Sequence, residues 1–264
     1  MPHILDRAEF YALAVLFRAS TIVGLDAAAL VAADPKSQQE LFTLGHHQLQ
    51  DRELIRPDSQ GAIDLERDLS EQFAAIVLPE QIVMVLRRLP AGERDLLMFY
   101  ERGGVFVELT IPRTGIYRLA RIGSADSLIA RVLEVLPITD RPYVPEALSL
   151  SGSRVATAFQ HVLERHETDA HALLETASTD DATLARYLVD VFASATFAGA
   201  ITLVRPTAEG SVRSSDITVI HSPDESWSLV SQNGSDRVWA ERMNAAALRS
   251  TLTLALARTS PEAV

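Results

Sequence analysis

The chain of 264 residues carries a formal net charge of -11, and 47% of its residues are hydrophobic, so it can fold around a substantial core. The acidic surplus disfavours binding to nucleic acid or to an anionic membrane surface. The sequence has no cysteine, which excludes disulfides, a thiolate nucleophile and cysteine-based metal sites.

Helical periodicity dominates the first part of the chain. Apolar residues spaced along one helical face predict helices at 9–19, 26–33, 36–51 and 65–76. A tight turn at 57–61, which contains Asp, Ser and Gly, joins the last two helices. A helix, a tight turn and a second helix in this order resemble a winged-helix module, which would favour DNA binding.

The charges in this segment argue against DNA. Between positions 34 and 56 the cations are Lys36, Arg52 and Arg56, and the carboxylates are Asp34, Glu40, Asp51 and Glu53. A surface that binds phosphate would carry a basic surplus. We therefore expect no nucleic-acid partner, although a regulatory winged-helix protein with a ligand-sensing domain remains the main alternative function.

After Pro79 the period of the apolar pattern changes from 3.6 to 2, which indicates strands. We predict four antiparallel strands at 81–88, 94–102, 105–111 and 115–122, followed by a helix from Ser124 to Leu136. The run 96–100 is continuously apolar, as in a strand covered on both faces. Gly103-Gly104 is a hairpin signal, and Pro112 is expected to end the third strand.

The second half repeats this order after a connector at 139–153 that is rich in Pro and Ser. Helices are predicted at 154–166, 169–178 and 180–192, then strands at 199–206, 215–221, 225–231 and 237–242, and a last helix at 245–257. A shift of 120 positions pairs Leu119 with Trp239, Leu128 with Leu248, Val132 with Leu252 and Leu136 with Leu256, since each difference, such as 239 − 119, is 120.

These patterns predict an α+β fold. It would be a quasi-twofold duplicated unit with a central antiparallel β-sheet flanked by helical bundles and a winged-helix-like segment near the N-terminus. The halves would be residues 1–138 and 154–264, joined by the connector 139–153 within one continuous domain.

The seven histidines raise the question of a metal site. His161, His166 and His171 are five positions apart, so on one continuous helix each would point about 140° away from the previous one. We therefore expect these side chains to lie on different faces and predict no metal site. The adjacent pair His46-His47 points apart on its helix for the same reason.

No known catalytic pattern occurs in the sequence. It lacks the G-x-S-x-G elbow of hydrolases, the G-x-G-x-x-G fingerprint and the P-loop. Asp180-Asp181 follow Thr179 where a helix dipole favours acidic residues, and Ser151-Gly152-Ser153 is typical of a helix cap. We expect a binding protein without cofactors, and an enzyme of unknown chemistry is the third option.

Aromatic side chains on a half-exposed sheet face are common anchors for a protein partner. Phe106 shares its predicted strand face with Glu108, on the more polar side, unless a helix covers it. We name Phe106, Glu108, the hairpin Gly103 and Trp227 as candidate partner-binding residues, with no catalytic and no metal-binding residue. For Trp227, and for Trp239, the favoured interpretation is that they fill the core of the second half.

Several short segments resemble the EspG family of proteins associated with type VII (ESX) secretion. HQLQDRELI at 47–55 resembles the family's L-x-x-R-G-L-[VI] element, with Glu53 where glycine is usual. DLERDL at 64–69, followed by LPE at 78–80, resembles its D-x-x-L…L-x-x-P element. VLP at 135–137 resembles its mid-chain L-L-P, and WAE at 239–241 before an Ala/Leu helix resembles its C-terminus.

The resemblance covers nearly the whole chain and implies a cytosolic chaperone without enzymatic activity. Members hold secretion substrates, PE–PPE heterodimers in mycobacteria, soluble before export, and their fold is a quasi-twofold sheet flanked by helical bundles. The hairpin between the second and third strands is often long and contributes to substrate binding in some members. Here it is only Arg102-Gly103-Gly104. The resemblance therefore implies a helical-hairpin secretion substrate and leaves open whether that substrate is a PE–PPE protein.

Residues 1–10 include Asp6 and Glu9 and lack the basic and apolar regions of a secretory signal. No uncharged apolar stretch of about 18 residues occurs either. We expect a cytoplasmic protein that does not insert into membranes. Self-association into a homodimer stays open.

Overall fold

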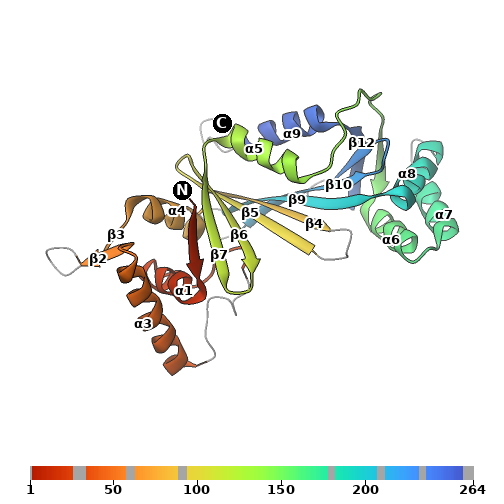
Figure 1. Cartoon of the computed structure of the whole chain (residues 1–264). Helices are drawn as coiled ribbons and strands as arrows, with labels where there is room; N and C mark the ends of the chain where they lie inside the picture. The colour runs from red at the N-terminus through yellow and green to blue at the C-terminus, as the bar shows by residue number, and fades with distance from the viewer. Residues whose placement is uncertain are drawn as a thin grey trace. The chain divides into compact units, whose positions relative to one another are not determined.

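The computed structural model describes residues 2–25, 34–57, 63–88, 94–177, 182–206, 212–231 and 236–257. Its helices are α1 Arg7–Leu16, α3 Pro35–Asp51, α4 Arg67–Val77, α5 Ala125–Val135, α6 Gly152–Leu163, α7 Glu167–Ala177, α8 Ala182–Ser194 and α9 Ala245–Ala257 (Figure 1). Its strands are β1 His3–Asp6, β2 Ile55–Pro57, β3 Ile63–Leu65, β4 Gln81–Arg88, β5 Arg94–Arg102, β6 Val105–Arg113, β7 Ile116–Ile122, β8 Ala147–Ser151, β9 Phe197–Pro206, β10 Val212–His221, β11 Ser226–Ser231 and β12 Arg237–Met243.

Most of the strands belong to one sheet. Its hydrogen-bonded order is β1-β7-β6-β5-β4-β9-β10-β11-β12-β8, and β2 and β3 form a separate hairpin. The pairs β1–β7, β5–β6, β6–β7, β10–β11, β11–β12 and β12–β8 are antiparallel. The predicted α+β fold with a large antiparallel sheet is confirmed.

The order of elements occurs twice along the chain, as the duplication predicts. An edge strand, a group of helices, a four-stranded meander and a closing helix appear first as β1 to α5 and again as β8 to α9. In both copies the edge strand pairs with the last strand of the meander, β1 with β7 and β8 with β12. The shift of 120 positions holds around the closing helices, where buried residues align: Leu128 with Leu248, Val132 with Leu252 and, directly after α5, Leu136 with Leu256.

The same shift fails in the preceding strand. Leu119 on β7 is fully buried, whereas Trp239 on β12 is 41% exposed. Ala240, one position further along, is fully buried. The predicted pairing of Leu119 with Trp239 is therefore wrong, because a one-residue slip moves every side chain of a strand to the opposite face.

The chain forms two compact units. Unit 1 consists of Met1–Met84, Leu97–Leu128 and Arg205–Val212, and unit 2 consists of Val85–Leu96, Ile129–Val204 and Arg213–Val264. The predicted halves, residues 1–138 and 154–264 joined by the connector 139–153, describe the repeated order of elements and not these two units. That division stays a prediction. No helix within the described ranges combines the length and the apolar character needed to cross a membrane.

In unit 1, helices α1 and α3 pack closely against each other (Figure 1). Asp6 and Glu9 form a capping box at the start of α1, with Glu9 N donating to Asp6 Oδ1 at 2.9 Å and Asp6 N donating to Glu9 Oε2 at 2.8 Å. Glu9 is buried and also accepts from Arg52 Nη1 at 2.6 Å. At the crossing, a Cβ atom on Gly45 would lie 1.9 Å from the Ala8 carbonyl oxygen, so this close approach requires glycine.

The winged-helix-like order of α3, the hairpin β2–β3 and α4 is confirmed. Asp34 caps α3 by accepting from the backbone N–H groups of Lys36 and Ser37, both at 3.0 Å, and Pro35 occupies the first turn. The helix predicted at 26–33, most of the turn at 57–61 and Asp180-Asp181 lie outside the described residues.

In unit 2, helices α6, α7 and α8 cover one face of the strands. Their buried side chains join those of β8, β10, β11 and β12 in one core, whose largest member is Trp227. Strand β8 lies inside the predicted connector, so that part of the connector is regular structure. Pro112 does not end β6 as predicted, because a register shift between Thr110 and Arg113 lets the strand continue past it.

Candidate functional site

An apolar pocket of about 280 Å³ lies in unit 2 between two helices and the sheet. Its walls come from α6, α8 and the strands β9 to β12. The lining residues are Gly152, Val155, Ala156, Phe159, Phe192, Ala198, Thr218, Ile220, Leu229, Ser231 and Val238. None of them carries a titratable side chain, so the pocket suits an apolar group and offers no acid or base for catalysis.

Strand alternation explains why these residues meet. Thr218 pairs directly with Leu229, and Ser231 pairs directly with Val238. Side chains of directly paired residues lie on the same face of a sheet, and positions two apart share that face. The side chains of both pairs, together with that of Ile220, therefore lie on the sheet face beneath α6 and α8.

The helices supply an aromatic wall. Val155, Ala156 and Phe159 lie along one side of α6, and Phe159 meets Phe192 of α8 edge to face, with ring centroids 5.4 Å apart and an interplanar angle of 90°. Phe192 and Val155 are buried, Phe159 is half-buried and Ala156 is exposed. The pocket thus has a buried apolar floor and opens at a rim that includes Ala156 and Ser231.

A polar cluster fixes the N-terminus of α6 beside the pocket. Asp236 Oδ2 accepts from the hydroxyls of Ser151 at 2.6 Å and Ser153 at 2.8 Å, and Asp236 Oδ1 accepts from Ser153 N at 2.8 Å. These hydrogen bonds lower the pKa of the Asp236 carboxyl. A Cβ on Gly152 would lie 3.0 Å from Val238 Cγ2, so α6 starts tight against β12. Ser151 occupies the N-cap position of α6 as predicted but makes no side-chain capping hydrogen bond, and the Asp236 carboxylate accepts from Ser153 N instead.

The four residues predicted to bind a partner do not line this pocket. Phe106 is half-buried on β6 of unit 1, directly paired with Glu101 and Ile122. Glu108 is buried, and Gly103 is exposed in the hairpin turn with a φ of 54°. Their role in partner binding stays a prediction.

Trp227 occupies the interior of unit 2. It is fully buried in the core beneath α6, α7 and α8, which is the interpretation that the sequence favoured. The guanidinium of Arg242 lies 5.6 Å from its ring centroid. A direct contact between Trp227 and a partner would require this core to open. Trp239 is 41% exposed, so the expectation that it fills the core is wrong.

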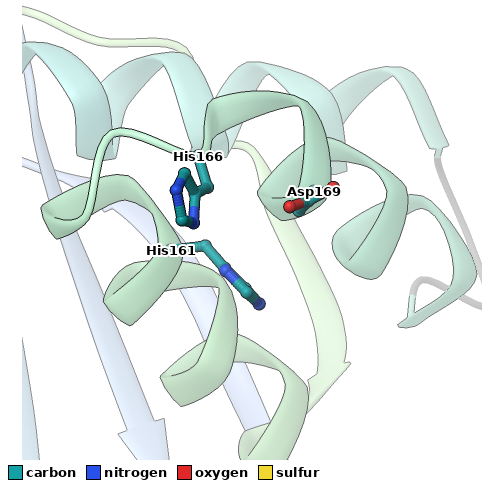
Figure 2. A group of neighbouring side chains, drawn as sticks. All are labelled: His161, His166 and Asp169. Carbon is teal, nitrogen blue, oxygen red and sulfur yellow. The ribbon is translucent and has the colours of Figure 1, made fainter.

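The structure brings together two of the three histidines that were considered for a metal site. The ligand atoms of His161, His166 and Asp169 lie within 4.8 Å of one another, and Figure 2 shows the three side chains where α6 gives way to α7. The expectation that His161 and His166 point apart is wrong, because the helix ends between them. His171 lies elsewhere, with its Nε2 3.3 Å from Asp190 Oδ1. Within the described ranges, this is a group that could hold a metal ion.

The winged-helix-like segment of unit 1 offers little to a phosphate backbone. The three cations counted in its sequence all pair with carboxylates: Lys36 with Glu40 at 3.8 Å, Arg52 with Glu9 at 2.6 Å and Arg56 with Glu53 at 2.6 Å. A nucleic acid would have to compete with these internal partners, in addition to the overall charge of -11.

Comparison with known proteins points to one fold. No protein-family model matches the sequence, and no curated protein matches it. Among solved structures, the chain is similar to the Mycobacterium tuberculosis type VII secretion system chaperone EspG5, solved in complex with a PE25–PPE41 dimer. The TM-score is 0.66 at 11% sequence identity, over 100% of this chain and 98% of that chain. The chain therefore has an EspG-like fold over its whole length.

Proposed function

We propose that this protein is a non-catalytic cytoplasmic chaperone that binds a helical-hairpin substrate of type VII secretion, PE–PPE-like or otherwise, and keeps it soluble before export. The observation that carries the proposal is the fold shared with EspG5 over 100% of this chain and 98% of that chain. The apolar pocket of unit 2 adds a place where a substrate side chain could be buried.

The size and lining of the pocket fit one large apolar side chain of a partner. A pocket of about 280 Å³ is below the usual range for drug-sized ligands and comparable to one or two aliphatic or aromatic groups. Burial of one Leu or Phe side chain contributes about 1.5–3 kcal/mol, which corresponds to a roughly tenfold to 150-fold gain in affinity. One anchor from the tip of a helical hairpin, surrounded by weaker contacts, is the pattern of a protein–protein hot spot.

Two rival functions receive less support. A regulatory winged-helix protein has the required order of elements, but its cations in that segment are paired with carboxylates. A gel shift with duplex DNA that weakens as salt increases would favour that reading over ours. An enzyme would need reactive groups, and the pocket lining supplies none.

The first experiment identifies the partner and the second tests the site. The tagged protein is used to pull down bound chains from its native cytosol, and mass spectrometry identifies those recovered in stoichiometric amounts. We expect a small helical secretion substrate that is soluble on co-expression with the chaperone and aggregates without it. Recovery of no stoichiometric chain, or a substrate equally soluble alone, would overturn the proposal.

Two variants of α6 then test the pocket against the identified substrate. Ala156 and Thr157 are neighbouring exposed residues, but only Ala156 lines the pocket. Ala156→Arg places a charge at the apolar rim and should weaken binding by at least about tenfold, whereas Thr157→Arg should stay within about twofold of the wild type. Circular dichroism confirms that both variants fold. Equal affinities for the two variants would remove the pocket from the interface.

A further inference from the structure

The corner between α6 and α7 brings two histidines and an aspartate together through its backbone geometry. Helix α6 ends in a Schellman motif, in which His166 N donates to the His161 carbonyl at 2.8 Å and Arg165 N donates to the Val162 carbonyl at 3.0 Å. Arg165 has the left-handed φ of 65° that this motif requires. The motif places the side chains of its first and last residues side by side, and here those residues are His161 and His166.

The start of α7 adds the third side chain. The His166 carbonyl accepts the first helical hydrogen bonds, from Asp169 N at 3.1 Å and Ala170 N at 3.2 Å. Asp169 is thus the third residue of α7, a position from which a side chain reaches back towards the residue before the helix. Figure 2 shows the two imidazole rings and the Asp169 carboxylate gathered at this corner. Three potential ligand side chains therefore converge within nine consecutive residues.

The surroundings of the histidines also fit a cation. The Nδ1 atom of His161 is buried and has no hydrogen-bond partner among the described residues. The Nδ1 atom of His166 lies 3.9 Å from Glu164 Oε2, beyond hydrogen-bond distance, so this carboxylate adds negative charge near the ring. Glu167 and Asp169 make the first turn of α7 acidic, which attracts positive charge.

We propose that His161, His166 and Asp169 bind a divalent transition-metal ion, with Zn²⁺ as the best fit. Two imidazole nitrogens and one carboxylate oxygen are ligands that Zn²⁺ prefers, and they are too few oxygens for Ca²⁺ or Mg²⁺. Ligand atoms around tetrahedral Zn²⁺ lie about 3.4 Å apart, so small rotations of these side chains from their present spacing close the site. Water completes the coordination. The ion fastens the end of α6, one wall of the apolar pocket, to the start of α7.

The test uses the full-length chain with its purification tag removed, stripped of metal with a chelator and then titrated with ZnCl₂ by calorimetry. Wild-type protein should bind one Zn²⁺ per chain with a dissociation constant of about 1 μM or lower, and its melting temperature should rise by several degrees. His166→Gln and Asp169→Asn should each weaken binding by at least about tenfold. Both residues are exposed, so these variants should fold even if His161→Gln does not.

His47→Gln is the matched control, because His47 is exposed on α3 and lies outside the group. Its Zn²⁺ affinity should equal that of the wild type. Co²⁺ added to the stripped protein should give a visible absorption band that disappears in His166→Gln and stays in His47→Gln. The proposal is overturned if the wild type binds no Zn²⁺ at about 100 μM, or if His166→Gln and Asp169→Asn bind as tightly as the wild type.

Discussion

The close crossing of α1 and α3 makes a strong prediction about Gly45. In Gly45→Ala the new Cβ would start 1.9 Å from the Ala8 carbonyl oxygen and 2.8 Å from Glu9 N, whereas real Cβ atoms essentially never come within 3.0 Å of a neighbour. The helices must therefore separate by at least 1.1 Å, the difference between 3.0 and 1.9 Å. The obstacle is backbone, so no side-chain rotation relieves it.

The expected cost follows from two opposing terms. Overpacking of this kind costs about 1–3 kcal/mol, and a rigid backbone contact places it at the upper end. Alanine recovers about 0.5–1 kcal/mol over glycine inside a helix. The net loss is about 2 kcal/mol, which should lower the melting temperature by about 4–6 °C.

Thermal and urea unfolding followed by circular dichroism measure this loss. Gln50→Ala is the control, because Gln50 is exposed on the same helix and its substitution should change stability by less than about 0.5 kcal/mol. A Gly45→Ala variant that melts at or above the wild type would refute the reasoning, since helix propensity alone would then decide the outcome.

Two further predictions concern the core of unit 2 and a surface charge cluster of unit 1. Trp227→Ala should lower the free energy of unfolding in urea by about 3–5 kcal/mol. Trp227→Phe should lower it much less, because the indole Nε1 has no hydrogen-bond partner among the described residues that would be lost. Equal losses in the two variants would contradict this reasoning. Arg121 binds Asp68 at 2.9 Å and Glu71 at 2.6 Å. Desolvation alone would raise the pKa of Asp68, but hydrogen bonds from His3 and Arg121 outweigh it and lower the pKa, and Arg121 also lowers the pKa of Glu71. A carboxyl whose pKa is lowered in the folded state stabilises the protein above its unfolded pKa, and this stabilisation is lost as the pH falls. Arg121→Gln should therefore lower the urea midpoint at neutral pH. The difference in midpoint between the variant and the wild type should close below about pH 4. A gap that persists at about pH 2 would show another origin.

Much of the secondary structure could be predicted because local signals agree with the fold. The bounds of β4, β5 and α9 are those expected from the sequence, where a continuous apolar run or a 3.6-residue apolar pattern meets clear breakers. The edge strands were missed for a physical reason. Strand β1 is only four residues long and runs directly into α1, and the alternation of β8, with Leu148 and Leu150 buried, is hidden among prolines and serines.

The sites were harder to predict because they depend on geometry that no short pattern encodes. The pocket requires the registers that pair Thr218 with Leu229 and Ser231 with Val238, and register is a property of two strands together. The histidine corner requires α6 to end at Leu163 with Arg165 in a left-handed conformation, a position usually marked by glycine. The spacing H-x4-H-x2-D was visible in the sequence, but its meaning depends on that helix end.

The placement of the edge strands has a consequence for the growing chain. An unpaired outer strand is a template for aggregation, and a nascent meander exposes one until its neighbour arrives. Here β1 precedes its partner β7, and β8 precedes its partner β12, so each covering strand has already been synthesised when the edge it covers emerges. Each half of a protein proposed to prevent aggregation of others can therefore pair the last strand of its meander as soon as that strand is synthesised. The outer edge that remains there is a strand of only four or five residues.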